Sequence, residues 1–190
     1  MPRYITDISE AATLLQEATR VLIVGSSGAG KTTLAREVAK RLRLTHISMD
    51  KEFFWLPDWV ARGRSEQREM IAEAVMNDRW VMDGSNPSSF DLRLPRTNIV
   101  LWMRVPRVVC IYSVYRRAIK TYGLTRDDMA AGCTEQLPDK EFLSYIWNFD
   151  RRHAPILERN FDLYGPHVPI FQVKSRREAD RLLDLMRSAH

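Results

Sequence analysis

A glycine-rich segment near the start of the sequence has the residue types and the spacing that binding a nucleotide phosphate requires. It reads Gly25-Ser26-Ser27-Gly28-Ala29-Gly30-Lys31-Thr32 and matches every fixed position of the pattern G-x-x-x-x-G-K-[ST]. Glycines let the backbone curl so that several N–H groups converge on phosphate oxygens, and the helix expected next adds its positive N-terminal end. We therefore expect residues 25–33, with Thr33 included, to bind ATP.

Two polar side chains of this segment predict further chemistry. The ammonium group of Lys31 is expected to contact the β- and γ-phosphates and to take part in catalysis, and the Thr32 hydroxyl is expected to ligate Mg²⁺. A chance glycine turn before a helix is the alternative interpretation. The context that the motif requires, an apolar strand before it and a helix after it, is present.

Two aspartates stand at the ends of predicted strands. Asp50 follows the run 45–49, and Asp83 follows the run 80–82. Ligands of open α/β sheets bind beyond the carboxyl ends of the strands, which favours a functional role for Asp83 over a simple Asp-Gly turn. Asp50 is either a base that takes a hydroxyl proton from an acceptor or merely a helix cap.

The elements that position these residues alternate between strands and helices. Residues 21–24 form a short, fully apolar run that is typical of a central parallel strand. Four further runs predict strands: 45–49, 80–82, 98–103 and 168–173. Such alternation predicts a parallel sheet covered on both faces. With the glycine-rich segment after the first run, we expect a P-loop NTPase fold, α/β in class, with a three-layer α/β/α arrangement around a five-stranded parallel sheet. Pro169 is expected to place the last strand near an edge.

One domain is expected to span residues 1–190. Residues 1–20 are predicted to be a helical extension, with Asp7 capping a helix over 8–18. Ser65 is expected to cap a further helix after the second strand.

A lid is predicted in the second half of the chain. Residues 123–138 are expected to form its loop, within a lid region of about 116–152. Pro106 is expected to open the helix that leads into this loop, and a single helix over 139–160 is expected to return from it.

Composition narrows the class of protein. The 190 residues are 45% apolar and 28% charged, with a formal net charge of +5. No apolar run approaches the ~20 residues of a membrane span, and Asp7 and Glu10 make the start unlike a signal peptide. Cys110 and Cys133 form no disulfide framework or metal spacing. We expect a cytoplasmic protein that contacts no membrane; whether it is a monomer or a dimer stays open.

On these residues the chain resembles the adenylate-kinase-like P-loop kinases, and within that group it is most similar to the DNA topology modulation proteins. The resemblance runs from about Val21 to Met186, whereas residues 1–20 have no usual counterpart in that family. Besides the glycine-rich segment, it rests on Ser48-Met49-Asp50-Lys51, Trp55, Trp59, Trp80-Val81-Met82-Asp83-Gly84-Ser85-Asn86, Asp91-Leu92-Arg93-Leu94, Glu141-Phe142-Leu143, Ile146-Trp147-Asn148-Phe149 and Lys174-Ser175-Arg176-Arg177-Glu178.

The resemblance implies roles for the residues after the strands. Asp83 matches the acidic residue that organises water around Mg²⁺ in nucleoside monophosphate kinases, and Asp50 lies where related kinases contact the acceptor. Adenylate kinases place an arginine soon after the Asp-Gly pair to hold the acceptor phosphate. Here Ser85-Asn86-Pro87 follows, so Asn86 and Arg93 are the candidate contacts and specificity for a nucleoside monophosphate is in doubt.

The resemblance also implies that arginines around the lid clamp the transferring phosphoryl group, whose charge spreads over its oxygens. Five arginines lie in the corresponding regions: Arg116, Arg117, Arg126, Arg151 and Arg152. Arg116 and Arg152 are expected to be catalytic and Arg151 to contact the substrate. The alternative is that exposed helices carry arginines in any case.

Two further sets of residues are implied to contact ligands. Ser175 and Arg176 match the loop that frames the adenine ring. Trp55 and Trp59 either stack on a ring of the acceptor or pack the acceptor-side segment onto the core.

Together these features predict an ATP- and Mg²⁺-dependent phosphotransferase acting on a small acceptor that bears a hydroxyl or a phosphate. Two other classes stay open. One is a regulator whose nucleotide state controls binding to DNA or to a protein, which the net positive charge makes possible without favouring it. The other is a simple ATPase.

Overall fold

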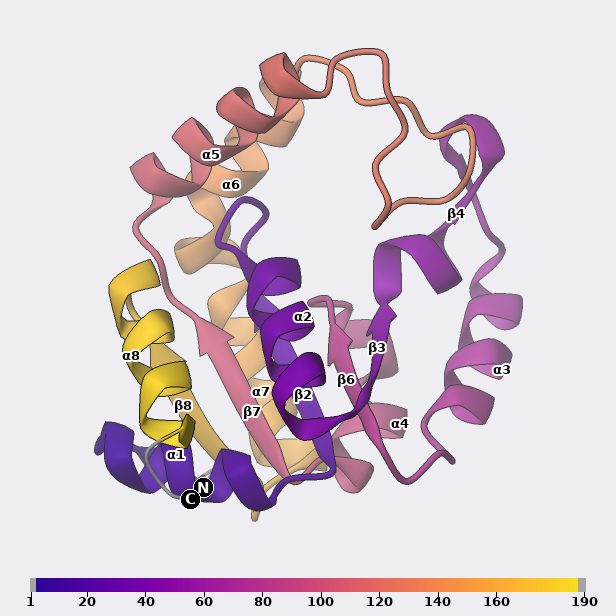
Figure 1. Cartoon of the computed structure of the whole chain (residues 1–190). Coiled ribbons are helices and arrows are strands. Elements are labelled where there is room, and N and C mark those ends of the chain that lie inside the picture. The colour runs from indigo at the N-terminus through magenta and orange to yellow at the C-terminus, as the bar shows by residue number, and fades with distance from the viewer. Residues whose placement is uncertain (1–2, 188–190) are drawn as a thin grey trace.

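A six-stranded parallel sheet forms the centre of the protein, in a computed structural model that describes residues 3–187 (Figure 1). In chain order the strands are β1 (Arg3–Ile5), β2 (Arg20–Gly25), β3 (Thr45–Ser48), β6 (Trp80–Asp83), β7 (Ile99–Met103) and β8 (Pro169–Val173). They lie in the order β1-β8-β7-β2-β6-β3, and each pair of neighbours is parallel. The sheet confirms the predicted α/β fold class.

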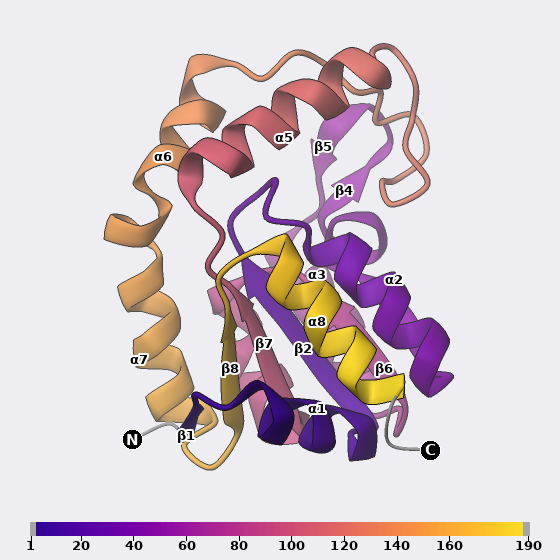
Figure 2. The ribbon, with the colours of Figure 1, turned by 60° about the vertical axis from the view of Figure 1, so that its left-hand side comes forward.

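Helices cover both faces of this sheet (Figures 1 and 2). They are α1 (Ile8–Glu17), α2 (Lys31–Leu42), α3 (Arg64–Ala74), α4 (Phe90–Arg93), α5 (Arg107–Lys120), α6 (Lys140–Arg152), α7 (Ala154–Tyr164) and α8 (Arg176–Arg187). The buried residues of α1, α2 and α8 belong to one apolar cluster, and those of α3, α4 and α7 belong to a second. The three layers are therefore confirmed. Within residues 3–187, none of the helices combines the length and the apolar composition that crossing a membrane takes.

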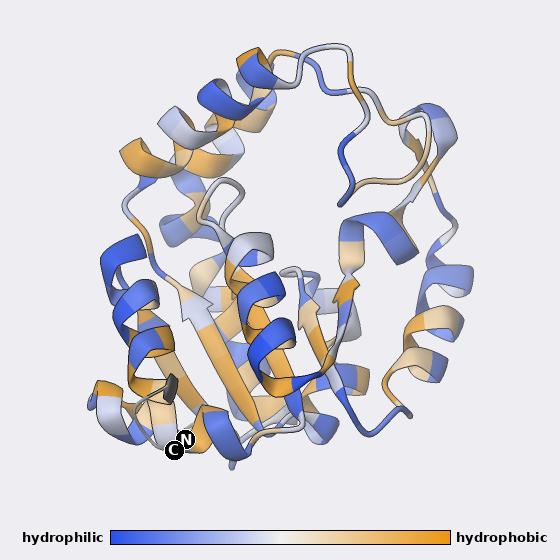
Figure 3. Cartoon of the chain, in the orientation of Figure 1, coloured by the Kyte–Doolittle hydropathy of each residue, from blue (hydrophilic) through white to orange (hydrophobic). Residues whose placement is uncertain are grey.

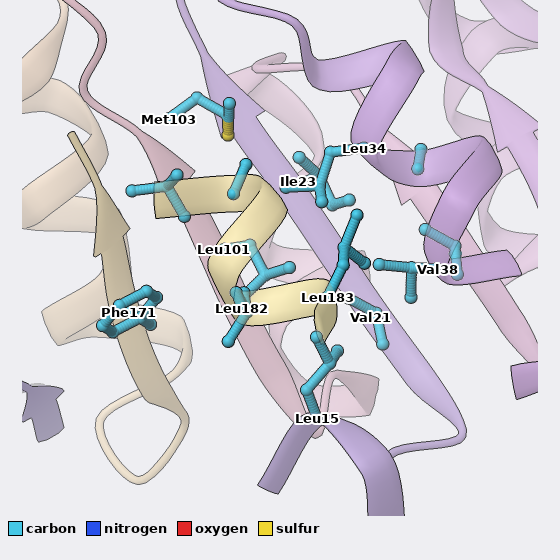
Figure 4. Close-up of a cluster of buried hydrophobic side chains, with 14 of the residues drawn as sticks. Leu15, Val21, Ile23, Leu34, Val38, Leu101, Met103, Phe171, Leu182 and Leu183 are labelled. Carbon is cyan, nitrogen blue, oxygen red and sulfur yellow. The ribbon is translucent and has the colours of Figure 1, made fainter. Parts of the chain in front are cut away.

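The central strand β2 is covered by helices on both faces, which explains its continuous apolar run. Val21 and Ile23 belong to the first cluster, whereas Leu22 and Val24 belong to the second, because successive strand residues point to opposite faces. All four side chains are fully buried. Figure 4 shows the first cluster around β2. Figure 3 shows that hydrophobic residues concentrate in the strands of the central sheet. A strand covered on both faces has no polar side to alternate with the apolar one.

The predicted number of strands was wrong by one. The sixth strand, β1, lies within residues 1–20, which were expected to be only a helical extension, and it pairs with β8 from Arg3 to Ile5. β1 is the edge strand and β8 is the second strand from that edge, which agrees with the expected place of β8 near an edge. Pro169 is tolerated because it is the first residue of β8, where its missing N–H interrupts no ladder. The predicted helix over 8–18 is confirmed as α1, with Asp7 Oδ1 accepting from Ser9 N at 2.8 Å.

Two predicted helices differ in their bounds. The single return helix over 139–160 is broken at His153 into α6 and α7. Pro155 explains the break, because proline lacks the N–H that a helix interior needs but is tolerated in a first turn. The second difference is that Ser65 lies inside α3, whose N-cap is Gly63.

Two excursions from the sheet flank the carboxyl ends of its strands. Between β3 and α3 lie a π-helical turn, Asp50–Phe54, and a small antiparallel hairpin of β4 (Trp55–Leu56) and β5 (Val60–Ala61). The loop between α5 and α6, which we call the lid loop, arches across to this hairpin (Figure 1).

Candidate functional site

The glycine-rich segment lies where β2 ends and α2 begins, at the point where the strand order reverses. β6 and β3 lie on one side of β2 and β7 and β8 on the other, an arrangement that opens a crevice beyond the strand ends. Gly28 and Gly30 have φ angles of 79° and 96°, in the left-handed region that glycine adopts readily. Lys31 Nζ donates to the backbone oxygen of Ser26 at 3.0 Å. The lysine is thus folded back over the curled loop.

Helix α5 packs directly on this loop at Gly28. A Cβ atom on Gly28 would lie 2.3 Å from the backbone oxygen of Cys110 and 2.9 Å from a methyl group of Val114. No side chain fits into that space, so the loop and α5 can approach only through a glycine.

Replacing Gly28 with alanine is expected to destabilise the protein by about 2–4 kcal/mol, because left-handed strain adds to the collision with α5. Gly123→Ala is the matched control, since Gly123 has a φ of 71° but no atom within 4 Å of the added Cβ. It should lose only about 1–2 kcal/mol. Denaturant unfolding measures both; equal losses would contradict the close packing of α5 on the loop.

Asp83, the last residue of β6, contacts the first turn of α2 and strand β3 at the floor of the crevice. Its Oδ2 accepts from Thr32 Oγ1 at 2.6 Å, and its Oδ1 lies 3.2 Å from Nε2 of His46 on β3. Asp83 is 4% exposed. The hydroxyl and the carboxylate are hard oxygen ligands beside the phosphate loop, and Mg²⁺ commonly combines one or two such ligands with waters and substrate phosphates. Thr32 and Asp83 therefore fit the predicted metal role.

Lys31 and Asp50 form the charged part of the crevice. Loss of solvent lowers the pKa of Lys31, and the negative charges of Asp50 and Asp83 act in the opposite direction. Although Asp50 keeps contact with solvent, the surrounding protein raises its pKa; Lys31 opposes this rise and Asp83 adds to it. The charges of Lys31 and Asp50 act on each other, so a charged ligand bound in the cleft is expected to change the pKa values of both groups.

A cleft of about 210 Å³ connects these groups. It is lined by Gly25, Ser27, Lys31, Asp50, Phe54, Gly84, Ser85, Asn86 and Tyr145. Ser85 closes one wall, because its hydroxyl accepts from Gly25 N at 2.7 Å and donates to Gly25 O at 2.8 Å. Tyr145 comes from α6, and burial, followed by the charge of Asp50, raises its pKa to about 12. The cleft thus brings the loop, the strand ends and α6 together.

A larger depression of about 380 Å³ lies at the other end of β3 and β6, lined by residues that include Thr45 and Trp80. It contains none of the glycine-rich segment. Its size alone gives it no chemistry, and the smaller cleft is the candidate site.

The two predicted acceptor contacts after β6 have different places. Asn86 lines the cleft, and its Oδ1 accepts from Ser88 N at 3.2 Å. Arg93 is fully buried, and it donates to Ser89 Oγ, Gly84 O and Asn86 O at 3.0, 2.8 and 2.6 Å. Arg93 therefore differs from the expectation, because its guanidinium holds the turn after β6 together and does not face an acceptor.

The predicted lid arginines are also placed differently from one another. Arg116 is exposed on α5, and Arg151 and Arg152 are exposed at the end of α6. Arg117, one residue along, is instead half-buried and donates from Nε to Glu135 Oε1 at 3.3 Å. Its positive charge acts on Lys31, and that of Arg126 acts on Asp50. Of the five arginines, Arg117 and Arg126 are thus coupled to the charged groups of the cleft.

Trp55 and Trp59 connect the hairpin to the lid loop. Their rings contact each other edge to face, with centroids 5.4 Å apart, and Trp59 Nε1 donates to Thr134 O at 2.9 Å. Lys51 Nζ donates to Asp127 O at 2.9 Å, which adds a second link to the same loop. Both tryptophans are only half-buried. The two rings therefore pack the hairpin against the lid loop, and they keep exposed surface on which an acceptor ring could stack.

The predicted adenine loop follows β8, beside α5. Ser175 Oγ accepts from Glu178 N at 3.1 Å at the start of α8, and the guanidinium of Arg176 donates to Ser113 Oγ of α5. Since α5 also packs on Gly28, Ser175 and Arg176 lie on the α5 side of the phosphate loop.

Several residues of the cleft were missed by sequence reasoning. Ser85 and Tyr145 line it, and His46 contacts Asp83. Only Ser85 had a local signal, its position next to the Asp-Gly pair. The other two belong to no spaced pattern, because their neighbours in the site come from distant parts of the chain.

Comparisons with known proteins agree with this geometry. Residues 21–82 match the family model of the ATPase family associated with various cellular activities (AAA). The chain is 25% identical over 175 residues to the uncharacterized protein YqaC of Bacillus subtilis (strain 168), covering 87% of this chain and 96% of that protein.

Among solved structures, the chain is similar to a shikimate kinase from Acinetobacter baumannii in complex with shikimate. The TM-score is 0.52 at 14% identity, over 93% of this chain and 96% of that one. A shikimate kinase from Bacteroides thetaiotaomicron gives a TM-score of 0.49 at 19% identity, over 90% and 97% of the two chains. The chain therefore has a P-loop kinase-like fold. The resemblance to DNA topology modulation proteins stays a prediction.

Proposed function

We propose that this chain is an ATP-dependent phosphotransferase that moves the γ-phosphoryl group of ATP to a small acceptor. One observation carries the proposal: a single cleft is lined both by the phosphate loop with Lys31 and by Asp50, and Thr32, next to Lys31, is hydrogen-bonded to Asp83. A carboxylate in the same cleft as the phosphate loop can take the proton of an acceptor hydroxyl.

The phosphate loop would bind ATP through the backbone N–H groups of residues 25–33 and the ammonium group of Lys31. Thr32 and Asp83 would hold Mg²⁺, which when bound neutralises charge on the β- and γ-phosphates. Ser175 and Arg176 are proposed to border the adenine, because they lie on the α5 side of the loop.

In the proposed transfer, the acceptor hydroxyl oxygen forms a bond to the γ-phosphorus while the bond to the β–γ bridging oxygen breaks and ADP leaves. The hydroxyl proton goes to the carboxylate of Asp50. Desolvation by the surrounding protein, with the charge of Asp83, raises the pKa of Asp50 although the side chain keeps contact with solvent, and this makes it a stronger base than an ordinary aspartate. Lys31 stabilises the charge on the phosphoryl oxygens. Asn86, Trp55 and Trp59 are proposed acceptor contacts.

Arginines of the lid are proposed to complete the site. Arg117 and Arg126 have the stronger claim, because their charges already act on Lys31 and Asp50. Arg116, Arg151 and Arg152 are exposed, so they would reach the phosphoryl group only after the lid moved.

The proposal is tested by ADP release in the presence of ATP and Mg²⁺, across a panel of nucleosides, nucleotides, sugars and amino alcohols. One class of acceptor is expected to accelerate ADP release and to yield an equal amount of phosphorylated product by ³¹P NMR. Steady ADP release that no acceptor changes would instead indicate a simple ATPase. Calorimetry that detects no uptake of ATP with Mg²⁺ would exclude both.

A further inference from the structure

The acceptor side of the cleft is built from a carboxylate, an amide and two aromatic rings. Among the described residues that line the cleft, the charged ones are Lys31, which belongs to the phosphate loop, and Asp50. Asn86, Phe54 and Tyr145 complete the acceptor side. A bound acceptor therefore meets a negative charge on its own side.

Two arginines of α3 and α4, Arg68 and Arg93, donate their hydrogen bonds to groups outside the acceptor side of the cleft. Arg93 uses its guanidinium on Ser89 and on two backbone oxygens of the turn after β6. Arg68 donates to both carboxylate oxygens of Asp91, at 3.1 and 2.6 Å. Neither guanidinium is available to hold an acceptor phosphate.

The two arginines coupled to the cleft from the lid are neutralised by carboxylates of the lid loop. Glu135 lies 3.3 Å from Arg117 Nε and 2.6 Å from Arg126 Nε, and Asp128 Oδ2 accepts from Arg126 Nη1 at 3.1 Å. Glu135 is 6% exposed, so its ion pairs are protected from solvent. Two positive and two negative groups form this cluster, which we call the lid cluster. Its charges cancel.

We propose that the acceptor is a small hydroxyl compound that carries no negative charge, and that Asp128 and Glu135 enforce this by withholding Arg126 and Arg117 from anionic acceptors. The inference rests on the proposed phosphotransferase function. It names the substrate class of that same site: a neutral polyol or nucleoside, or a hydroxyl compound with an ammonium group.

The physical reason is like-charge repulsion. A phosphate or carboxylate of the acceptor would lie beside Asp50 and next to the phosphates of ATP. Arg68 and Arg93 are paired elsewhere, and Arg117 and Arg126 are already paired with carboxylates of the lid cluster. A hydroxyl avoids this penalty because it donates to Asp50, and an ammonium group gains from the same carboxylate.

Pairs of acceptors that differ in one anionic group provide the test. Each pair combines a nucleoside, a sugar or an amino alcohol with its phosphorylated or carboxylated counterpart. With ATP and Mg²⁺, the uncharged or ammonium-bearing member is expected to have a kcat/KM at least about 10-fold higher than its anionic counterpart. Preference for the anionic member, or no discrimination within any pair, overturns the inference.

The same pairs are titrated by calorimetry into protein saturated with Mg²⁺ and a non-hydrolysable ATP analogue. This separates the inference from the proposed function. Selective binding of the uncharged member without any turnover contradicts the phosphotransferase function and leaves the charge selection standing. Turnover that favours the anionic member contradicts the charge selection and leaves the function standing.

Asp128→Asn tests the role of the lid cluster, because it removes one of the negative charges that neutralise Arg126. The ratio of kcat/KM for the anionic member to that for the neutral member is expected to rise about 10-fold, mainly through a lower KM for the anion. Asp127→Asn is the matched control, since it removes the same charge from an exposed neighbour that contributes only its backbone oxygen to Lys51. Its ratio should stay that of the wild type.

Inorganic phosphate gives a readout that does not depend on turnover. With ADP and Mg²⁺ bound, Asp128→Asn should bind inorganic phosphate more tightly than the wild type by the same factor of about 10. Thermal unfolding checks that the variant is folded. If both aspartate variants change the ratio equally, or if neither changes it, the lid cluster does not select the acceptor.

Discussion

Replacing Lys31 with alanine is expected to lower ATP turnover roughly 10³-fold or more, because a preorganised charge aimed at the transferring phosphate is removed. The side chain is also the only charged group that the phosphate loop contributes to the cleft among the described residues. Backbone N–H groups alone would still bind the nucleotide weakly. Steady-state ADP release with the best acceptor measures the loss.

The fold should survive this substitution. Burial lowers the pKa of Lys31, so the folded state holds its ammonium group at a penalty that is present at neutral pH and is relieved only as the pH rises through the lowered value towards 10.5. Alanine removes that penalty, and the Tm at pH 7 should stay the same or rise. Lys40→Ala, on an exposed position of α2, is the control and should change neither turnover nor Tm. Full catalysis by Lys31→Ala would sink the phosphate assignment.

Replacing Asp83 with asparagine is expected to raise the Mg²⁺ concentration for half-maximal activity by at least about 10–100-fold. The two side chains have the same shape, and the amide oxygen can still accept from Thr32, so the fold should change little. What is lost is the negative charge that a divalent cation needs. Activity measured against Mg²⁺ concentration, at saturating ATP, gives the shift.

Asp78→Asn is the control for this second variant. Asp78 is exposed and precedes the opposite end of β6, where it pairs with Arg20 and Arg96. It should leave the Mg²⁺ dependence unchanged. An Asp83→Asn enzyme with the wild-type Mg²⁺ dependence would show that the metal is held elsewhere.

The strongest sequence predictions concerned contiguous segments. The run 21–24 and residues 25–32 together specify a buried strand, a tight turn and a helix start, and the structure has all three in that order. Such a unit needs no distant partner to be recognised, because the glycines, the lysine and the apolar run act through local backbone geometry. The fold class followed from the same alternation along the chain.

Short or interrupted elements were harder to predict. β1 has only three residues, and their partner on β8 is more than 160 positions away in sequence, so no local pattern announces the pairing. The break at His153 had a signal in Pro155, but helical periodicity on both sides outweighed it.

The predicted arginines differ in burial and in their ion-pair partners, and no local sequence pattern indicates these differences. Arg93 and Arg116 have the residue type that a phosphate clamp needs, yet one is buried within its own turn and the other faces solvent. The lid cluster unites Arg117 with Glu135 and Arg126 with Asp128, and its effect on the acceptor depends on all four charges.

By itself, the sequence specified a glycine-rich turn between a buried strand and a helix and placed a carboxylate after each of two predicted strands, since those features reside in a few consecutive residues. Only the tertiary structure decided that Thr32 meets Asp83 across 51 positions, that Tyr145 closes the cleft from α6, and which arginines remain available. The reason is physical: burial and charge compensation depend on neighbours in space, and a linear pattern does not specify them.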